Sequence, residues 1–141
     1  MRIKAIAGII VAAIFIVTVP ILSAEEHKTP TAPKEYLDMK NPFKASKDVM
    51  ERAEDIYMKK CKKCHGEKGD GKGSASKDLE IKPRVYNKEF LSKIPPGQLF
   101  WITEKGSPNT DMEAFGPGSE TNISKDDIWK LITYIYEKFG K

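Results

Sequence analysis

The sequence has few of the residues that staple small domains or bind metal ions. Its 141 residues include only two cysteines, Cys61 and Cys64, and two histidines, His27 and His65. Two cysteines exclude a disulfide-stapled mini-protein, because such scaffolds contain more than about 8–10% cysteine. A zinc site is also disfavoured, because it needs four ligands and His27 lies far from the cluster at 61–65.

The chain also lacks a strong charge of either sign and any convincing strand alternation. Twenty-four basic residues face 20 acidic ones, which gives a net charge of +4. This small excess does not predict nucleic-acid binding, which normally requires a pronounced basic patch. Without the period-two alternation of half-buried strands, the sequence predicts an all-α protein.

The long apolar run of the chain stands at its N-terminus. Residues 1–24 carry Arg2 and Lys4, no acid, and an uninterrupted apolar stretch from Ala5 to Val17. This pattern predicts an export segment. Two alternatives remain open, a cleaved signal peptide and a retained membrane anchor, since the apolar part approaches the length that crosses a roughly 30 Å bilayer core. In either case we expect the rest of the chain to be periplasmic, or held at the periplasmic face of the inner membrane.

The exported part divides into two regions. Residues 25–45 contain three prolines and show no helical or strand period, so they predict a Pro-rich linker or a strap on the surface of the next domain. Residues 46–141 form the expected domain, in which capping residues and apolar spacing predict three helices. These are the stretch from Ser46 to the cysteines, the stretch from Pro96 to Gly106, and the stretch from Ser124 to Gly140.

A domain of this kind has an energetic problem that the cysteines resolve. Three short helices and long loops bury too little apolar surface to offset the entropy lost on ordering the loops. Cys61-Lys62-Lys63-Cys64-His65 has the pattern C-x-x-C-H, which attaches c-type haem: the two thiols add to the vinyl groups and the imidazole reaches the iron. A thiol redox motif fits less well, because the pair follows a helix and no strand precedes it. One covalently bound haem c therefore supplies the missing core.

From about residue 46 onward the chain resembles the class I c-type cytochromes. The resemblance rests on A-x-x-I-Y-x-x-x-C-x-x-C-H-G at 53–66, G-D-G-K-G at 69–73, K-P-R at 82–84, L-F-W-I-T-E-K-G at 99–106 and I-W-K-L-I-T-Y-I at 128–135. It implies an all-α, cytochrome c-like fold, with three to five short helices and long loops around one haem. It also implies that the first and last helices cross, with Ala53 and Tyr134 at the crossing.

The resemblance further implies the remaining contacts of the iron. Met112 is the expected axial ligand opposite His65, and the carbonyl of Pro83 is the expected acceptor for the other imidazole nitrogen. Glu113 stands where the family commonly has proline, and we expect it to loosen the Met–iron bond or to lower the potential. Three aromatic residues are candidates for packing on the haem or for the ordinary core, namely Tyr57, Tyr86 and Trp101.

The charges are unevenly distributed in the domain. Residues 59–77 contain seven lysines and two acids, whereas residues 104–127 contain six acids and two lysines. Such asymmetry steers transient docking, so we expect a redox partner with an acidic patch to meet the Lys-rich haem-attachment segment.

Three functions follow from these features. The leading hypothesis is an electron carrier without enzymatic activity, whose iron cycles between Fe(II) and Fe(III) under His/Met ligation. The second is a membrane-anchored haem c subunit of a quinol-oxidising or terminal-oxidase complex. The third is a small haem enzyme or ligand sensor, which requires Met112 to be absent from the iron.

Overall fold

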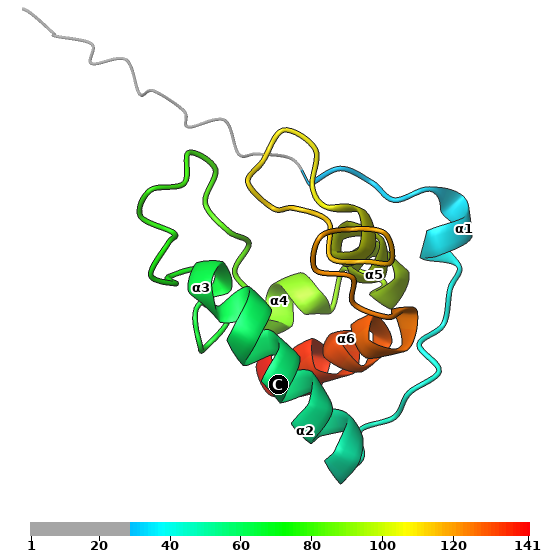
Figure 1. Cartoon of the computed structure of the whole chain (residues 1–141). Helices are drawn as coiled ribbons and strands as arrows, with labels where there is room; N and C mark the ends of the chain where they lie inside the picture. The colour runs from blue at the N-terminus through cyan, green and yellow to red at the C-terminus, as the bar shows by residue number, and fades with distance from the viewer. Residues whose placement is uncertain (1–28) are drawn as a thin grey trace, which may run out of the picture.

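The computed structural model describes residues 29–141, which form short helices joined by long loops (Figure 1). Within this range the chain has no strand, as the all-α prediction requires. Among residues 29–141, no helix is long and apolar enough to cross a membrane. The segment predicted to direct export, residues 1–24, and His27 lie outside the described residues. The helices are α1 (Lys34–Leu37), α2 (Lys47–Ile56), the π-helix η1 (Tyr57–Cys61), α3 (Lys62–His65), α4 (Lys88–Leu91), α5 (Pro96–Lys105) and α6 (Lys125–Phe139).

The three helices expected from the sequence begin where their capping residues indicate. The Ser46 hydroxyl accepts a hydrogen bond from the Val49 amide at 3.4 Å, at the start of α2. The Ser124 hydroxyl accepts one from the Asp127 amide at 3.2 Å, at the start of α6. Pro96 opens α5, where its missing N–H is not needed. Local capping chemistry therefore determines the helix boundaries.

The π-helical turn and the short helices α1 and α4 were not expected from the sequence. The helix that starts after Ser46 continues into the cysteines, as expected: α2, η1 and α3 form one helical body, because the residues at both junctions keep right-handed helical dihedrals. A π-helical turn is rare and often lies at a functional site, and here it ends at Cys61, the first cysteine of the motif. Asn87 caps α4, since its side chain accepts a hydrogen bond from the Phe90 amide at 2.8 Å.

The first and last long helices cross, as the resemblance implies. Figure 1 shows α2 passing over α6, and these two helices share the most extensive contact in the fold. Ala53 and Tyr134 are both buried in the core. Tyr134 donates a hydrogen bond to Glu54 at 3.3 Å, and its ring lies 5.5 Å from that of Tyr57. The crossing holds the body that ends in the cysteine motif.

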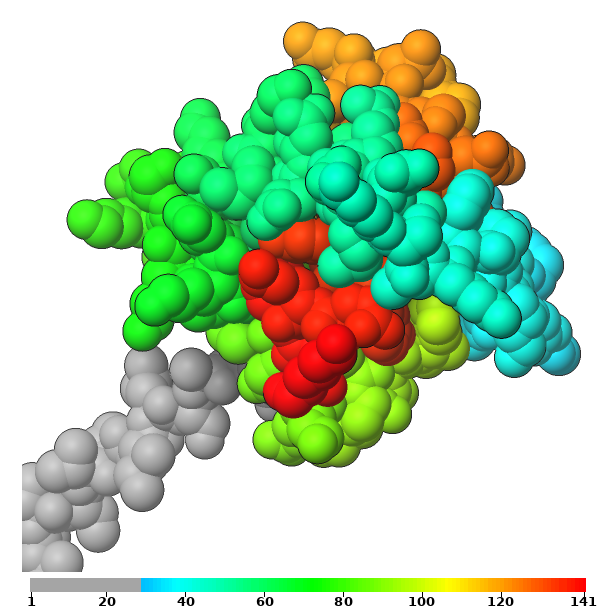
Figure 2. All heavy atoms as spheres, turned by 90° about the horizontal axis from the view of Figure 1, so that it is seen from below, coloured from blue at the N-terminus to red at the C-terminus, as the bar shows by residue number. Residues whose placement is uncertain are grey.

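Residues 29–45 form a strap that is held to the domain by buried polar contacts. Gln98, on α5, donates to the Pro30 carbonyl at 2.9 Å and accepts from the Ala32 amide at 2.8 Å. Asn41 donates to Thr133 of α6 at 2.9 Å. In the space-filling view, the cyan chain that leads into α2 lies across the domain beside red α6 (Figure 2). The sequence left two alternatives open, a linker and a strap on the surface of the domain. Over residues 29–45 the structure shows the strap.

The ion pair between α2 and α6 makes stability depend on pH. Arg52 donates to Asp127 at 2.6 Å, and Lys130 lies 3.1 Å from the other oxygen. The Arg52 hydrogen bond holds the pKa of Asp127 below its usual range. A depressed carboxyl pKa stabilises the fold above the ordinary pKa, and this contribution is lost as pH falls through the folded-state pKa. We expect Asp127→Asn to cost about 1 kcal/mol at neutral pH.

Urea denaturation of the wild type and of Asp127→Asn, repeated at decreasing pH, checks this expectation. The gap between the two unfolding free energies should close once the carboxyl is protonated in both states. A gap that stays constant down to strongly acidic pH would contradict the assignment.

Candidate functional site

The two cysteines of the motif lie one helical turn apart with free thiols. Cys61 ends η1 and Cys64 lies within α3, and both are partly buried. Burial raises the pKa of Cys61 to about 12, so this thiol is neutral at physiological pH. A helical i, i+3 spacing places both sulfurs on one side of the helix. Both thiols are therefore available for bonds to a group outside the chain.

His65 follows the second cysteine and is buried, with 9% of its surface exposed. Its Nδ1 lies 3.2 Å from the Arg84 carbonyl oxygen. A carbonyl oxygen only accepts hydrogen bonds, so Nδ1 carries the proton and Nε2 keeps a lone pair. Burial lowers the pKa of His65, which favours this neutral form. The ring also stacks on Tyr86 at a centroid distance of 4.8 Å, so its orientation is restrained from two sides.

The acceptor for His65 is Arg84 and not Pro83, which the sequence had suggested. The Pro83 carbonyl points instead toward the glycine loop, since a Cβ added at Gly71 would lie 2.8 Å from that oxygen. The acceptor is therefore the carbonyl one residue further along the chain than the predicted one. A backbone acceptor leaves no side-chain signature, and for this reason the sequence could identify only the segment.

The G-D-G-K-G loop at 69–73 folds back onto the motif. The amide of Gly71 donates to the His65 carbonyl at 2.8 Å, and the amide of Gly73 donates to that of Cys64 at 3.1 Å. Gly71 has a φ of +70°, a left-handed conformation that glycine adopts without strain. The loop thus satisfies the carbonyls at the end of α3 and fixes the backbone that carries the predicted ligands.

Met112 lies partly buried on the loop between α5 and α6. We call residues 106–123 the distal loop; Figure 1 shows it in yellow and orange beside α5. The Met112 carbonyl accepts from the Ser107 amide at 2.9 Å, and the Met112 amide donates to Thr110 Oγ1 at 3.1 Å. Gly106, with φ of +79°, starts the loop against this carbonyl. Ligation of the iron by Met112 stays a prediction.

The donor groups fit a covalently attached haem better than a bare metal ion. Across residues 29–141 no cluster of three or more His, Cys, Asp or Glu side chains gathers to hold a metal. What the motif offers is two free thiols and one imidazole nitrogen with a lone pair. Two thioether bonds to a haem would use both thiols, and one bond to its iron would use the imidazole nitrogen.

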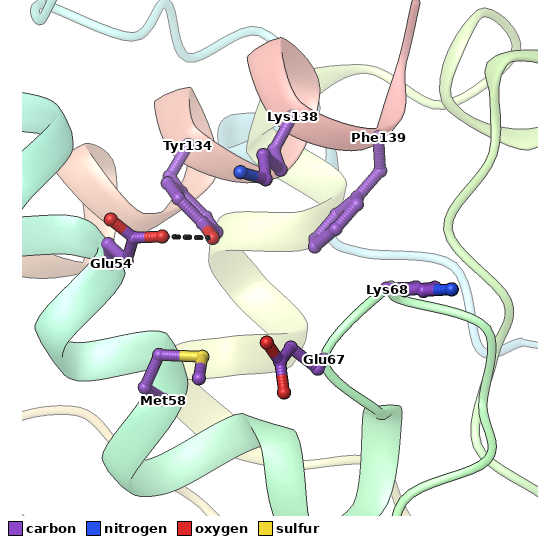
Figure 3. A pocket seen from close by; sticks show the side chains of 7 residues that line it. All are labelled: Glu54, Met58, Glu67, Lys68, Tyr134, Lys138 and Phe139. Atoms are coloured by element: carbon purple, nitrogen blue, oxygen red, sulfur yellow. Dashed lines mark hydrogen bonds between the residues drawn. The ribbon is translucent and has the colours of Figure 1, made fainter.

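A surface pocket lies at the crossing of α2 and α6 (Figure 3). Its volume is about 310 Å³, near the lower limit for small-molecule sites. In Figure 3 the hydrogen-bonded pair of Glu54 and Tyr134 lies on one side of it, and Glu67 and Phe139 lie on the other. None of the predicted haem-binding residues lines this pocket, so it is separate from the motif. Its lining residues are Glu54, Met58, Glu67, Lys68, Tyr134, Lys138 and Phe139.

Ion pairs in the fold neutralise some of the charges that the sequence places in the acidic and the Lys-rich segments. Part of the acidic segment is neutralised by residues outside it, because Asp127 pairs with Arg52 and Lys130. In the Lys-rich segment, Lys59 pairs with Asp55 at 2.7 Å. The other exposed lysines of this segment make no ion pair within the described part of the chain, and a positive surface remains. They are Lys60, Lys63, Lys68, Lys72 and Lys77.

Comparisons with known proteins identify the family and the fold of this chain. Residues 48–135 match the family model described as cytochrome c oxidase, cbb3-type, subunit III. Among solved structures, a chain of the reducing HAO-like protein complex of Kuenenia stuttgartiensis is similar, with a TM-score of 0.57 and 23% identity over 73% of this chain and 48% of that one. Cytochrome cL of Methylophaga aminisulfidivorans gives a TM-score of 0.52 and 18% identity over 84% of this chain and 72% of that one.

Both structural similarities extend to the fold alone. The chain spans about half the length of the Kuenenia protein. No curated protein sequence matches it significantly. The family match covers most of the domain, including the whole motif. The fold and site define a c-type cytochrome, and the chain belongs to the family whose model is described as subunit III of cbb3-type cytochrome c oxidase.

Proposed function

We propose that this chain binds one haem c and acts as an electron-transfer protein rather than an enzyme. Cys61 and Cys64 form the covalent links, and His65 and Met112 are the axial ligands. The observation that carries the proposal is the environment of the motif: two free thiols one turn apart, followed by a buried neutral imidazole with Nε2 available. The bound group supplies a one-electron Fe(II)/Fe(III) couple whose potential is raised by a methionine ligand.

The chain's own residues have distinct roles in this proposal. Cys61 and Cys64 would hold the haem, each through a thioether bond between its sulfur and a vinyl group. The Arg84 carbonyl fixes the His65 tautomer and makes the imidazole a stronger donor. The glycine loop holds this segment rigid through its amides. A rigid ligand frame suits electron transfer, because little has to move when the charge changes.

A second candidate function is a haem c subunit of a larger membrane complex. The description of the matching family, an oxidase subunit, favours it. In this case residues 1–24 would hold the domain at the periplasmic face of the inner membrane. Determination of the mature N-terminus and purification of the untagged chain's native assemblies distinguish a free carrier from a subunit.

The electron-carrier proposal is tested on the full chain, produced in a host that attaches c-type haem. We expect reversible reduction and oxidation by small redox reagents, together with slow binding of carbon monoxide to the reduced form. Rapid carbon monoxide binding, or catalytic consumption of peroxide, would instead indicate an enzyme or a sensor with an open iron.

We also propose that the exposed lysines near the motif dock an acidic redox partner. Electrostatic steering raises association rates by tenfold or more and is screened by salt. The rate of electron transfer to an acidic partner protein should therefore fall about tenfold between low and high ionic strength. Lys63→Glu should weaken the salt dependence, whereas Lys34→Glu on the strap should not. A rate that does not depend on salt would refute the docking proposal.

A further inference from the structure

Glu104 is a buried carboxylate in the last turn of α5, and only 2% of its side chain is exposed. A negative charge at this place is unfavourable on two counts. The C-terminal end of a helix already carries partial negative charge. Burial also penalises the ionised form of a carboxyl group. Other groups must compensate if the carboxylate is retained.

The compensation comes from three segments of the chain. The Tyr36 hydroxyl, on α1 of the strap, donates to Glu104 Oε2 at 2.7 Å. Lys105, next in α5, lies 3.4 Å from the same oxygen, and Lys125 in the first turn of α6 lies 3.4 Å from Oε1. Burial alone would raise the pKa of Glu104, but the Tyr36 hydrogen bond and the two lysines outweigh it and hold the pKa below its usual range. The carboxylate is therefore ionised and joins the strap to both helices.

The distal loop returns directly over this carboxylate. The amide of Phe115 donates to the Thr103 carbonyl at 3.0 Å, and that of Gly116 donates to the Glu104 carbonyl at 3.1 Å. Gly116 lies so close that an added Cβ would be 2.4 Å from Glu104 Cγ. Only three residues separate Met112 from Gly116. The position of Met112 therefore depends on where these two backbone hydrogen bonds fix the distal loop.

We infer that Glu104 is a positioning residue for Met112, because it clamps the strap, the end of α5 and the start of α6 beneath the return of the distal loop. The inference rests on the proposed ligation of the iron by Met112. It gives the strap a role as well, since the Tyr36 hydroxyl belongs to the clamp. Loss of the clamp leaves the fold intact and lets the distal loop move away from the iron.

The test uses the haem-loaded full chain with Glu104→Gln and Tyr36→Phe. The readouts are the near-infrared charge-transfer band of the oxidised protein, which reports the Met–iron bond, and the rate of carbon monoxide binding to the reduced protein. We expect Glu104→Gln to weaken the band and to speed carbon monoxide binding about tenfold, the factor that a charge-assisted hydrogen bond contributes. Tyr36→Phe should act in the same direction with a smaller change.

Asp127→Asn is the matched control, because it also removes a paired, mostly buried carboxylate, but one that joins α2 to α6. It should leave both readouts unchanged. Equal effects of Asp127→Asn and Glu104→Gln would overturn the inference, as would an unchanged band in Glu104→Gln. Met112→Ala separates the two levels of the proposal: if its band survives, the ligand assignment fails, and if its band is lost while that of Glu104→Gln is unchanged, only the positioning role fails.

Discussion

The double variant Cys61→Ser/Cys64→Ser is expected to carry no haem that survives denaturation and to fail to reach the native fold. A serine hydroxyl does not form the thioether bond, so both covalent links are lost. The physical reason for the loss of folding is the small apolar core, which consists of short helices around loops that are costly to order. Haem staining after denaturing electrophoresis measures the first effect, and protection from proteolysis measures the second.

The exposed residue between the two cysteines provides the control for this variant. Lys63→Ser changes the same turn and leaves both thiols in place, so it should keep the haem and the fold. Each single cysteine variant should retain one link and an intermediate amount of bound haem. A double variant that folds as the wild type does would show that the chain builds its core without the haem.

Gly73→Ala is the second substitution with a large expected effect. A Cβ at this position would lie 2.2 Å from the Lys63 carbonyl oxygen and 2.5 Å from that of Lys62. Both are backbone atoms of α3, so neither can move without displacing the motif. Overpacking of this kind costs about 3 kcal/mol or more when the neighbours are rigid. Denaturant unfolding of the haem-loaded variant measures the loss of stability.

The adjacent Ser74 gives the matched control, because its side chain is exposed on the same loop. Ser74→Ala should change the unfolding free energy by less than about 0.5 kcal/mol. If Gly73→Ala were equally mild, the loop would not be packed against the motif as closely as the structure indicates.

The sequence predicted most of what local chemistry determines. Ser46, Pro96 and Ser124 mark helix starts through capping, and the structure has α2, α5 and α6 at those places. The C-x-x-C-H pattern predicted the site, because its spacing matches the chemistry of haem attachment. These features depend on residues that are close together in the chain.

The remaining features depend on contacts between distant residues. The strap is held by Gln98 and Asn41, whose partners lie more than 50 residues away, and no periodic pattern signals such contacts. The acceptor of His65 is a backbone carbonyl, which any residue supplies. Glu104 appeared in the sequence as one acid of a charged segment, and only the fold brings Tyr36 to it.

Ligation of the haem iron by His65 and Met112 can be measured in the near-infrared spectrum of the oxidised, haem-loaded chain. We expect a methionine-to-iron charge-transfer band in the wild type that disappears in Met112→Ala, while the haem stays covalently attached. A wild type without this band, or a band that persists in Met112→Ala, would show that Met112 does not ligate the iron.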